Sequence, residues 1–153
     1  MALIIESSLL EKHLELFFEE HSEDVFVLHT DIGAWGLLKG LTKRDEFLSA
    51  YWELLSKASK DCSLVFPLFN YAYGSSRRYD VLRDKCQVGV MNEYTRLLRP
   101  EKRTRTPIFN FIEWPNETFS LAPNENPFDE SSLWGDLCRR DGIFTVNQCG
   151  GAG

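Results

Sequence analysis

The chain has 153 residues, of which 43% are hydrophobic and 26% are charged, and its net charge is −6. These proportions are those of a globular fold and exclude a disordered tail. The acidic balance disfavours nucleic acid and anionic membrane as partners, because both need a positive field. The longest apolar stretch, Leu64–Phe69, is too short to span a bilayer, and residues 1–8 do not resemble a secretory signal. We therefore expect a cytoplasmic protein.

The apolar periodicity predicts helices alternating with strands along one domain, residues 1–153. In chain order, they are a helix over 9–20, a strand over 25–28, a helix over 42–57, a strand over 63–66, a helix over 88–98, a strand over 108–112, a helix over 131–140 and a strand over 143–146. Residues 70–85 and 114–127 are rich in turn-forming residues and predict irregular segments. The fold class is therefore α/β, and the strands over 25–28 and 63–66 are expected to pair in parallel.

Local signals place the helix ends and faces. Ser8 with Glu11 fits a capping box for the first helix, and Thr42 is expected to cap the second. Helical stripes predict which side chains face inward, namely Leu10, Leu14, Phe17 and Phe18 in the first helix and Met91, Tyr94, Leu97 and Leu98 in the third. The chain closes on Gly150, Gly151 and Gly153, which favours a domain that is incomplete at this end.

Polar residues follow two of the predicted strands. In open α/β sheets, ligands bind beyond the carboxyl ends of the strands, and this rule selects His29, Thr30 and Asp31 after the first strand. It also selects Asn70 and Tyr71 after the second. His29 could act as a base or be a hydrogen-bonded structural residue, and Asp31 could orient a ligand or cap the next helix.

An arginine-rich cluster stands out in this acidic chain. Its members are Arg96, Arg99, Lys102, Arg103 and Arg105. Such a cluster can bind phosphates through bidentate hydrogen bonds, or it can be a helix C-terminus followed by solvated side chains. Tyr71, Tyr73 and Tyr79 could line a sugar site or cover an apolar face.

Several common sites are excluded by spacing. The four cysteines form no C-x-x-C pair, so we expect reduced thiols and no metal. Phosphate-binding, dinucleotide-binding, nucleophile-elbow and zinc-protease signatures are also missing from the sequence. A small nucleotide-binding domain is therefore disfavoured.

Four ordered segments resemble motifs of the aminoglycoside 3-N-acetyltransferase (antibiotic N-acetyltransferase) family. They are His29–Ile32 with Gly36 (H-S-S-L…G), Phe66–Tyr71 (M-P-T-F-T-Y), Cys86–Glu93 (S-x-V-G-x-L-x-E) and Asn126–Gly142 (x-P-F-x-x-x-S…L…x-G). The resemblance implies a three-layer α/β/α sandwich with a mixed, largely parallel sheet. It also implies acetyl transfer from acetyl-coenzyme A to a primary amine on an aminoglycoside or amino sugar, with a homodimer as one possible assembly.

The resemblance also implies which residues bind the coenzyme. These are His29, Thr30, Asp31 and Ile32, with Cys86 and Val88 near the start of the third helix and Arg103, Thr104 and Arg105 near the phosphates. Asn70 and Tyr71 are then expected to contact the acceptor.

Two departures from the family pattern affect this prediction. Residues 103–110 lack the two histidines of the family's R-S-x-H-P-x-H-S segment and look more like relatives that acetylate nucleotide-linked amino sugars in surface-polysaccharide pathways. The family's catalytic histidine lies in a T-x-x-H-x-x-E segment that would fall beyond Gly153, so no residue here is assigned to catalysis. We therefore expect a fragment with little or no turnover, and a non-catalytic coenzyme-A-binding or interaction fragment is the alternative.

Overall fold

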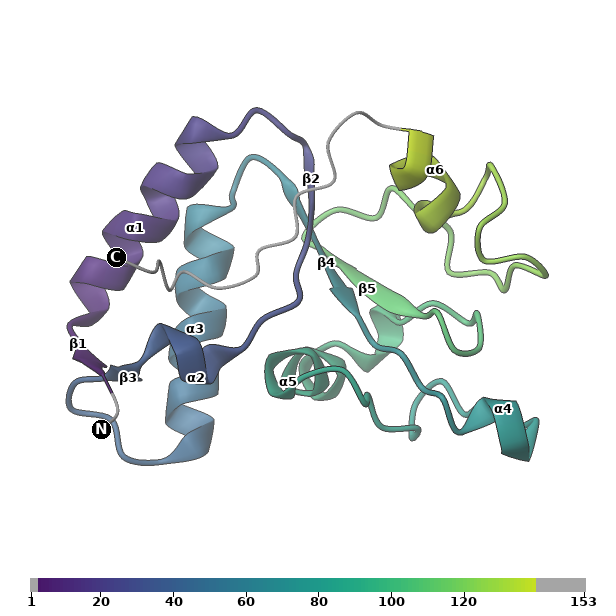
Figure 1. Ribbon diagram of the computed structural model, residues 1–153, viewed down its shortest axis with the longest axis horizontal. Helices are drawn as coiled ribbons and strands as arrows, with labels where there is room; N and C mark the ends of the chain where they lie inside the picture. Colours follow the sequence, from purple (N-terminus) through teal and green to yellow (C-terminus); the bar gives the residue numbers. More distant parts are fainter. Residues whose placement is uncertain (1–2, 140–153) are drawn as a thin grey trace.

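The computed structural model describes residues 3–139, which form an α/β fold (Figure 1). The strands are β1 (Ile4–Ile5), β2 (Val25–Val27), β3 (Leu37–Leu38), β4 (Ser63–Pro67) and β5 (Phe111–Trp114). The α-helices are α1 (Ser7–Glu20), α2 (Ile32–Trp35), α3 (Arg44–Ala58), α4 (Tyr73–Ser76), α5 (Val90–Leu98) and α6 (Leu133–Arg139), and one 3-10 turn covers Pro100–Lys102. None of these helices is long and apolar enough to cross a membrane.

The central sheet has the order β2-β4-β5 and is mixed. β2 and β4 pair in parallel with Phe26 opposite Leu64, as predicted, and β4 pairs with β5 antiparallel with Phe66 opposite Ile112. Among residues 3–139, this sheet therefore has one parallel and one antiparallel pairing. Two further strands, β1 and β3, form a separate parallel pair that the sequence did not predict, because two residues are too few to show a period.

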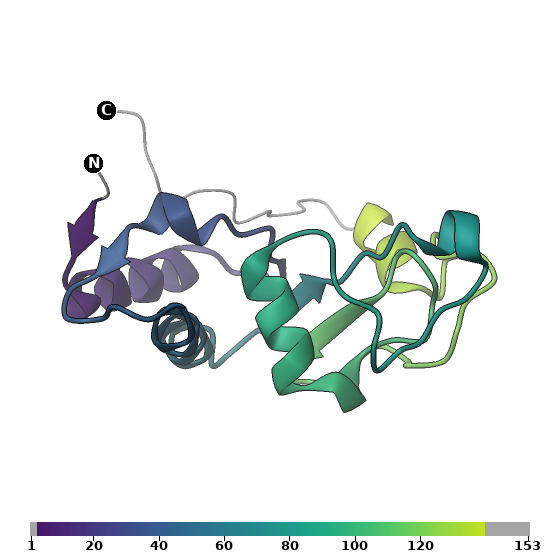
Figure 2. The same cartoon turned by 90° about the horizontal axis from the view of Figure 1, so that it is seen from below.

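Apolar burial explains why β4 is central. Every residue of β4 is buried, since one face meets α3 and α5 and the other meets α6 and β5 side chains. α1 packs on α3, and their inward side chains join Phe26 and Phe66 in one core. One end of the molecule carries α1, β1, α2 and β3, and the opposite end carries α4 and α6 (Figures 1 and 2).

The four predicted helices each begin two residues from the predicted start and end within one residue of the predicted end. α1 begins at Ser7 after the N-cap Glu6, so Ser8 is not its cap. α3 follows Lys43 rather than Thr42, because the Glu46 carboxylate accepts from the backbone N–H groups of both residues. Leu97 was predicted to face inward and is 64% exposed. Met91 is buried and Tyr94 and Leu98 pack against the core, as predicted, and the polar residues Asn92, Thr95 and Arg96 of α5 are buried as well.

The third strand lies three residues later than predicted. Ile108 has a φ of 65°, which interrupts an extended strand, and pairing with β4 starts only at Phe111. Before that point, Asn110 O accepts from Leu68 N at 2.8 Å and Ile108 O from Asn70 N at 3.2 Å. The predicted strand over 143–146 lies outside the described residues.

Candidate ligand site at the carboxyl edge of the sheet

The carboxyl ends of β2 and β4 meet the first turn of α5. The Asn92 side chain is fully buried, and its Nδ2 donates to Leu28 O at 3.3 Å and to Pro67 O at 2.7 Å. One amide therefore holds both strand ends against the N-terminus of α5. Sequence reasoning did not select Asn92, although a polar residue next to the inward Met91 was a signal for it.

Two buried polar atoms at this edge have no partner among residues 3–139. They are Asn92 Oδ1 and Thr30 Oγ1. Because Asn92 Nδ2 serves two carbonyls, the orientation of its amide is fixed and Oδ1 must point away from them. Unpaired buried acceptors cost free energy, so such atoms are expected where a ligand or ordered water supplies the missing hydrogen bond.

Gly89 lies next to Asn92 Oδ1 and to the backbone of Thr30. A Cβ placed on Gly89, the N-cap of α5, would be in van der Waals contact with Asn92 Oδ1 and with the backbone oxygen of Thr30, both at 3.7 Å. Gly89 also has a φ of 130°, a conformation that other residues rarely adopt. Backbone N–H groups in the first turn of a helix favour anions. The edge thus offers hydrogen-bond acceptors and a helix N-terminus within one turn of α5.

The loop after β2 carries the predicted residues in different roles. His29 is half-buried with its ring centroid 6.4 Å from that of Phe69, and burial lowers the pKa of its imidazole below 6.5. His29 is therefore neutral near pH 7. Asp31 Oδ1 accepts from Gly33 N at 3.0 Å, which decides in favour of a cap for α2. Ile32 is partly buried against the core.

Cys86 and Val88 shape the approach to α5. The Cys86 backbone N–H donates to Glu93 Oε2 at 2.8 Å, and Cys86 Sγ lies 3.4 Å from Val88 N. Burial raises the pKa of the Cys86 thiol, so the thiol stays protonated. Burial also acts to raise the pKa of Glu93, but hydrogen bonds from Arg96 and from Cys86 N–H lower it below its usual value. These contacts give the turn a structural role.

The predicted acceptor residues Asn70 and Tyr71 differ in their exposure to solvent. Asn70 is buried and its Oδ1 accepts from Ala72 N at 2.9 Å, which closes a turn. Tyr71 is 54% exposed, and its ring lies 6.3 Å from that of Phe69. Of these two residues, Tyr71 is therefore the one that presents its side chain to solvent.

Arg103 is not available to a phosphate, which corrects the prediction from its position. Its side chain is 1% exposed and donates to Asn110 Oδ1 at 2.8 Å. It donates further to the carbonyl oxygens of Leu68 at 3.2 Å, Val81 at 3.2 Å and Asp84 at 2.5 Å. The guanidinium thus fastens irregular segments together instead of facing solvent.

The other basic side chains are also dispersed. Arg96 is buried and pairs with Glu93 at 2.6 Å, and Arg99 lies 4.7 Å over the Trp114 ring. Lys102 pairs with Glu117 at 2.6 Å. Arg105 is exposed. Among the arginines from residue 101 to residue 139, only Arg105 and Arg139, which ends α6, could contact a phosphate without unfolding of a loop. The cluster is therefore neither a joint phosphate site nor simply a solvated surface.

Thr104 and Tyr79 complete the structural network around Arg103. Thr104 is 2% exposed, and its Oγ1 accepts from Phe111 N at 3.0 Å. Tyr79 donates to Thr104 O at 2.9 Å and lies under the Arg103 guanidinium at 5.2 Å, and burial raises the pKa of Tyr79 to about 12. Tyr79 thus covers a buried cation and does not line a sugar site.

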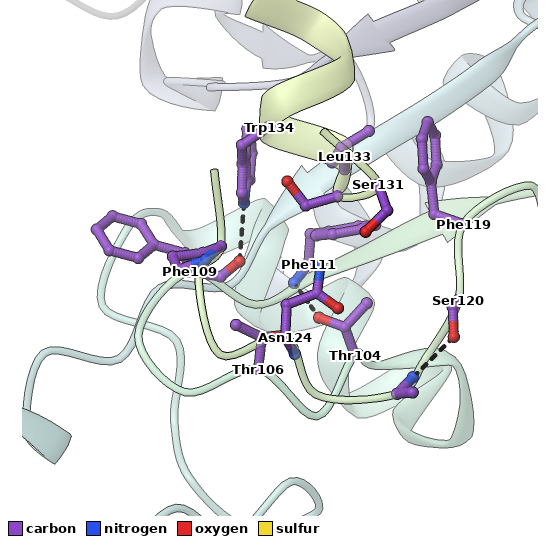
Figure 3. Close-up of a pocket in the computed structure, with 13 residues that line it drawn as sticks. Thr104, Thr106, Phe109, Phe111, Phe119, Ser120, Asn124, Ser131, Leu133 and Trp134 are labelled. Atoms are coloured by element: carbon purple, nitrogen blue, oxygen red, sulfur yellow. Dashed lines mark hydrogen bonds between the residues drawn. The ribbon is translucent and has the colours of Figure 1, made fainter. Parts of the chain in front are cut away.

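A small aromatic cavity lies between β5 and α6 (Figure 3). Phe109, Phe111, Phe119 and Trp134 surround it, and Trp134 Nε1 donates to Phe109 O at 2.9 Å. Its volume is about 30 Å³, so it has room for water but not for a sugar ring. In residues 3–139, no group of three or more His, Cys, Asp or Glu side chains could hold a metal ion.

Comparison with known proteins places this geometry in a fold. No protein-family model matches the chain, and no curated protein matches it. A solved structure of sisomicin-bound AAC-VIa, an aminoglycoside acetyltransferase, is similar with a TM-score of 0.52 and 17% identity. The match covers 82% of this chain and 55% of that one, so the chain spans about half the length of AAC-VIa. At this identity the likeness shows a shared α/β fold.

Proposed function

We propose that this chain binds the coenzyme A carrier of an acetyl group at the carboxyl edge of β2 and β4. The observation that carries the proposal is the meeting of Thr30, Asn92 and the N-terminus of α5, where two buried polar atoms lack partners. Coenzyme A brings amide N–H groups for such acceptors and phosphates for a helix N-terminus or for the exposed Arg105. The shared fold with an acetyltransferase supports the same assignment.

The proposed reaction of the intact protein is acetyl transfer to a primary amine of an aminoglycoside or amino sugar. The amine must lose a proton before its nitrogen attacks the thioester carbonyl, and the thiolate of the carrier then leaves. Of the three histidines, His13 lies on α1 and His21 follows its last turn, so His29 alone lies at this edge. We propose that an acid–base residue beyond this sequence completes the site, within a full three-layer α/β/α sandwich.

Calorimetry of the chain with coenzyme A tests the binding step. Thr30→Val removes one unpaired hydroxyl and is expected to weaken binding about three- to tenfold, the value of one hydrogen bond, without loss of stability. Thr30→Ser keeps the hydroxyl and is the matched control. Arg105→Ala is expected to weaken coenzyme A but not pantetheine, which lacks the nucleotide phosphates. A folded chain that binds no coenzyme A at millimolar concentration would rule the proposal out.

A thiol-release assay separates the enzyme from the alternative of a non-catalytic coenzyme-A-binding fragment. Acetyl-coenzyme A is mixed with an aminoglycoside or a nucleotide-linked amino sugar, and free thiol is measured. We expect binding with little release from the chain alone. Rapid release would contradict the assignment of the missing base to a segment beyond Gly153.

A further inference from the structure

Four aromatic side chains from three loops touch one another in sequence and form what we call the aromatic row. Its members are Tyr71, Phe69, Phe109 and Phe128, in this order. Successive ring centroids lie 6.3, 5.3 and 5.0 Å apart. The two end members, Tyr71 and Phe128, are 54% and 53% exposed, so solvent reaches the row at both ends. Exposed patches of large apolar side chains mark binding sites.

The aromatic row begins at the candidate ligand site. Phe69 follows β4, and its carbonyl oxygen accepts from Gln87 N at 3.0 Å, two residues before Gly89, the N-cap of α5. The Phe69 ring also lies 6.4 Å from the ring of His29, the residue before Thr30. A ligand on the row therefore lies beside the carboxyl edge to which coenzyme A binding is assigned above.

A strained turn holds Phe109 in the row. Ile108 has a φ of 65°, and Phe109 N donates across it to Pro107 O at 2.8 Å, which is the rare classic γ-turn. From α6, Trp134 Nε1 donates to Phe109 O at 2.9 Å, and the Phe109 ring points away from Phe119 (Figure 3). Strained backbone of this kind concentrates at ligand sites, where the surrounding structure fixes it.

Phe128 is exposed and yet lies on a fixed loop. Its backbone N–H donates to Asn126 Oδ1 at 3.0 Å. A Cβ on Gly135 of α6 would lie 1.9 Å from Asp129 O and 2.9 Å from Phe128 O, so the loop contacts the helix at a distance that only glycine permits. An exposed ring that is already held in place binds a ligand with little further loss of conformational entropy.

A carboxylate lies next to the Phe128 end of the row. Asp129 is exposed, and its Oδ1 accepts from Ser131 N at 2.8 Å and from Ser131 Oγ at 2.9 Å. These hydrogen bonds lower the pKa of Asp129, so it is ionised near neutral pH. Aromatic faces also attract cations, and the net charge of −6 adds a long-range attraction. The row therefore suits a ligand that combines an apolar ring face with an ammonium group.

We infer that the aromatic row binds the sugar ring of the amine acceptor, with the apolar face of that ring on the aromatic side chains and its ammonium group near Asp129. The inference rests on the proposed function, because acetyl transfer requires an amino sugar beside the carrier. It makes Phe109 and Phe128 specificity-determining residues, in addition to Tyr71, which sequence analysis selected. Aminoglycosides and nucleotide-linked amino sugars share this ring.

A titration of the full chain with glucosamine, followed by NMR, tests the inference. The indole N–H signal of Trp134 is the local probe, because this ring lies 5.5 Å from that of Phe69 and its Nε1 donates to Phe109 O. We expect this signal to shift with glucosamine. Glucose, which lacks the amine, should bind about two- to fivefold more weakly, the value of one exposed cation–π contact.

Variants of the end members locate the binding site. Tyr71→Ala with Phe128→Ala should weaken glucosamine at least about tenfold, because two ring faces are lost. Phe128→Tyr keeps the ring and should stay within about twofold of the original affinity. Leu97→Ala, at an exposed position of α5, is the matched control and should change nothing. All these side chains are exposed, so the variants should fold, which circular dichroism checks.

The source of the ring is identified by titrations with kanamycin and with UDP-glucosamine. Tighter binding of either than of glucosamine, lost in Tyr71→Ala with Phe128→Ala, supports the inference and names the source. Affinity that this double variant leaves unchanged would overturn it, as would binding that does not shift the Trp134 signal. Coenzyme A binding without binding of any amino sugar would overturn the inference alone. Amino-sugar binding without coenzyme A binding would contradict the proposed function alone.

Discussion

The two halves of the molecule are held together by different physics. From α1 to β4, the interior is an apolar core in which Leu14, Leu28 and Leu55 are almost completely buried. Beyond β4, the interior is largely polar: ten of the thirteen buried polar or charged residues lie from Asn70 onward. Apolar contacts tolerate small shifts, whereas hydrogen bonds need exact partners. The first half should therefore lose stability gradually under substitution, and the second half steeply.

Arg103→Met should have the largest effect. It leaves Asn110 Oδ1 and three carbonyl oxygens without their donor in a buried place. We expect a loss of about 4 kcal/mol in the free energy of unfolding, measured in urea by tryptophan fluorescence. Arg105→Met, on an exposed side chain, is the control and should cost under about 0.5 kcal/mol. Equal effects of the two would remove the contrast between the halves.

Leu55→Ala probes the apolar half. Leu55 is fully buried on α3, and its truncation should cost about 3 kcal/mol through lost burial and a cavity. Leu97→Ala, at an exposed position of α5, should cost under about 0.5 kcal/mol. Leu55→Met should recover most of the lost stability, because apolar packing accepts a side chain of similar volume. Failure of Leu55→Met to do so would mean that this half is as exacting as the other.

Glu113→Gln tests a single carboxylate in the polar half. Glu113 accepts from Ser63 Oγ at 2.9 Å and from the backbone N–H groups of Thr118 and Phe119 at 2.8 and 3.1 Å. An amide has one oxygen and turns N–H donors toward the others, so we expect a cost of about 2 kcal/mol. The exposed Glu117→Gln should cost under about 0.5 kcal/mol in the same urea titration.

The pH dependence of stability near His29 should be the smallest effect. Burial lowers the pKa of His29 in the folded chain below its ordinary value of 6.5, so the unfolded chain takes up the proton first as the pH falls. This contribution to stability is present above pH 6.5 and is lost as the pH drops below it. His29→Gln should flatten the unfolding free energy between about pH 7.5 and 5. An unchanged slope would show that His29 is not desolvated.

The apolar half of the fold could be predicted from the sequence. The stripe of Leu10 and Leu14 and the continuous runs of β2 and β4 have a period that depends on neighbouring residues alone. The ends of the helices were less predictable, because Glu6 and Lys43 became N-caps through backbone geometry that other residue types would also allow. The parallel pairing of β2 with β4 followed from the helix between them.

The polar half could not be predicted in the same way. Arg103 stands near Arg99 and Lys102 in the sequence and so indicated a phosphate site or a solvated surface. Its burial depends on carbonyl oxygens from residues 68, 81 and 84, which no local pattern brings to it. The rule that ligands bind beyond the carboxyl ends of strands predicted where the candidate site lies. The same rule did not select Asn92, which ties these strand ends to α5. The ligand of that edge stays a prediction.

The Arg103 side chain also acts as a non-covalent crosslink between the two ends of a distant segment, residues 68–84. Its guanidinium joins Leu68 to Val81 and Asp84, which lie at opposite ends of the irregular stretch around α4. Arg77 and Arg78 stand exposed within that stretch. The rate at which trypsin cuts at Arg77 and Arg78 therefore depends on the buried Arg103, which trypsin cannot reach. A substitution at position 103 would first increase the rate of proteolysis within that stretch.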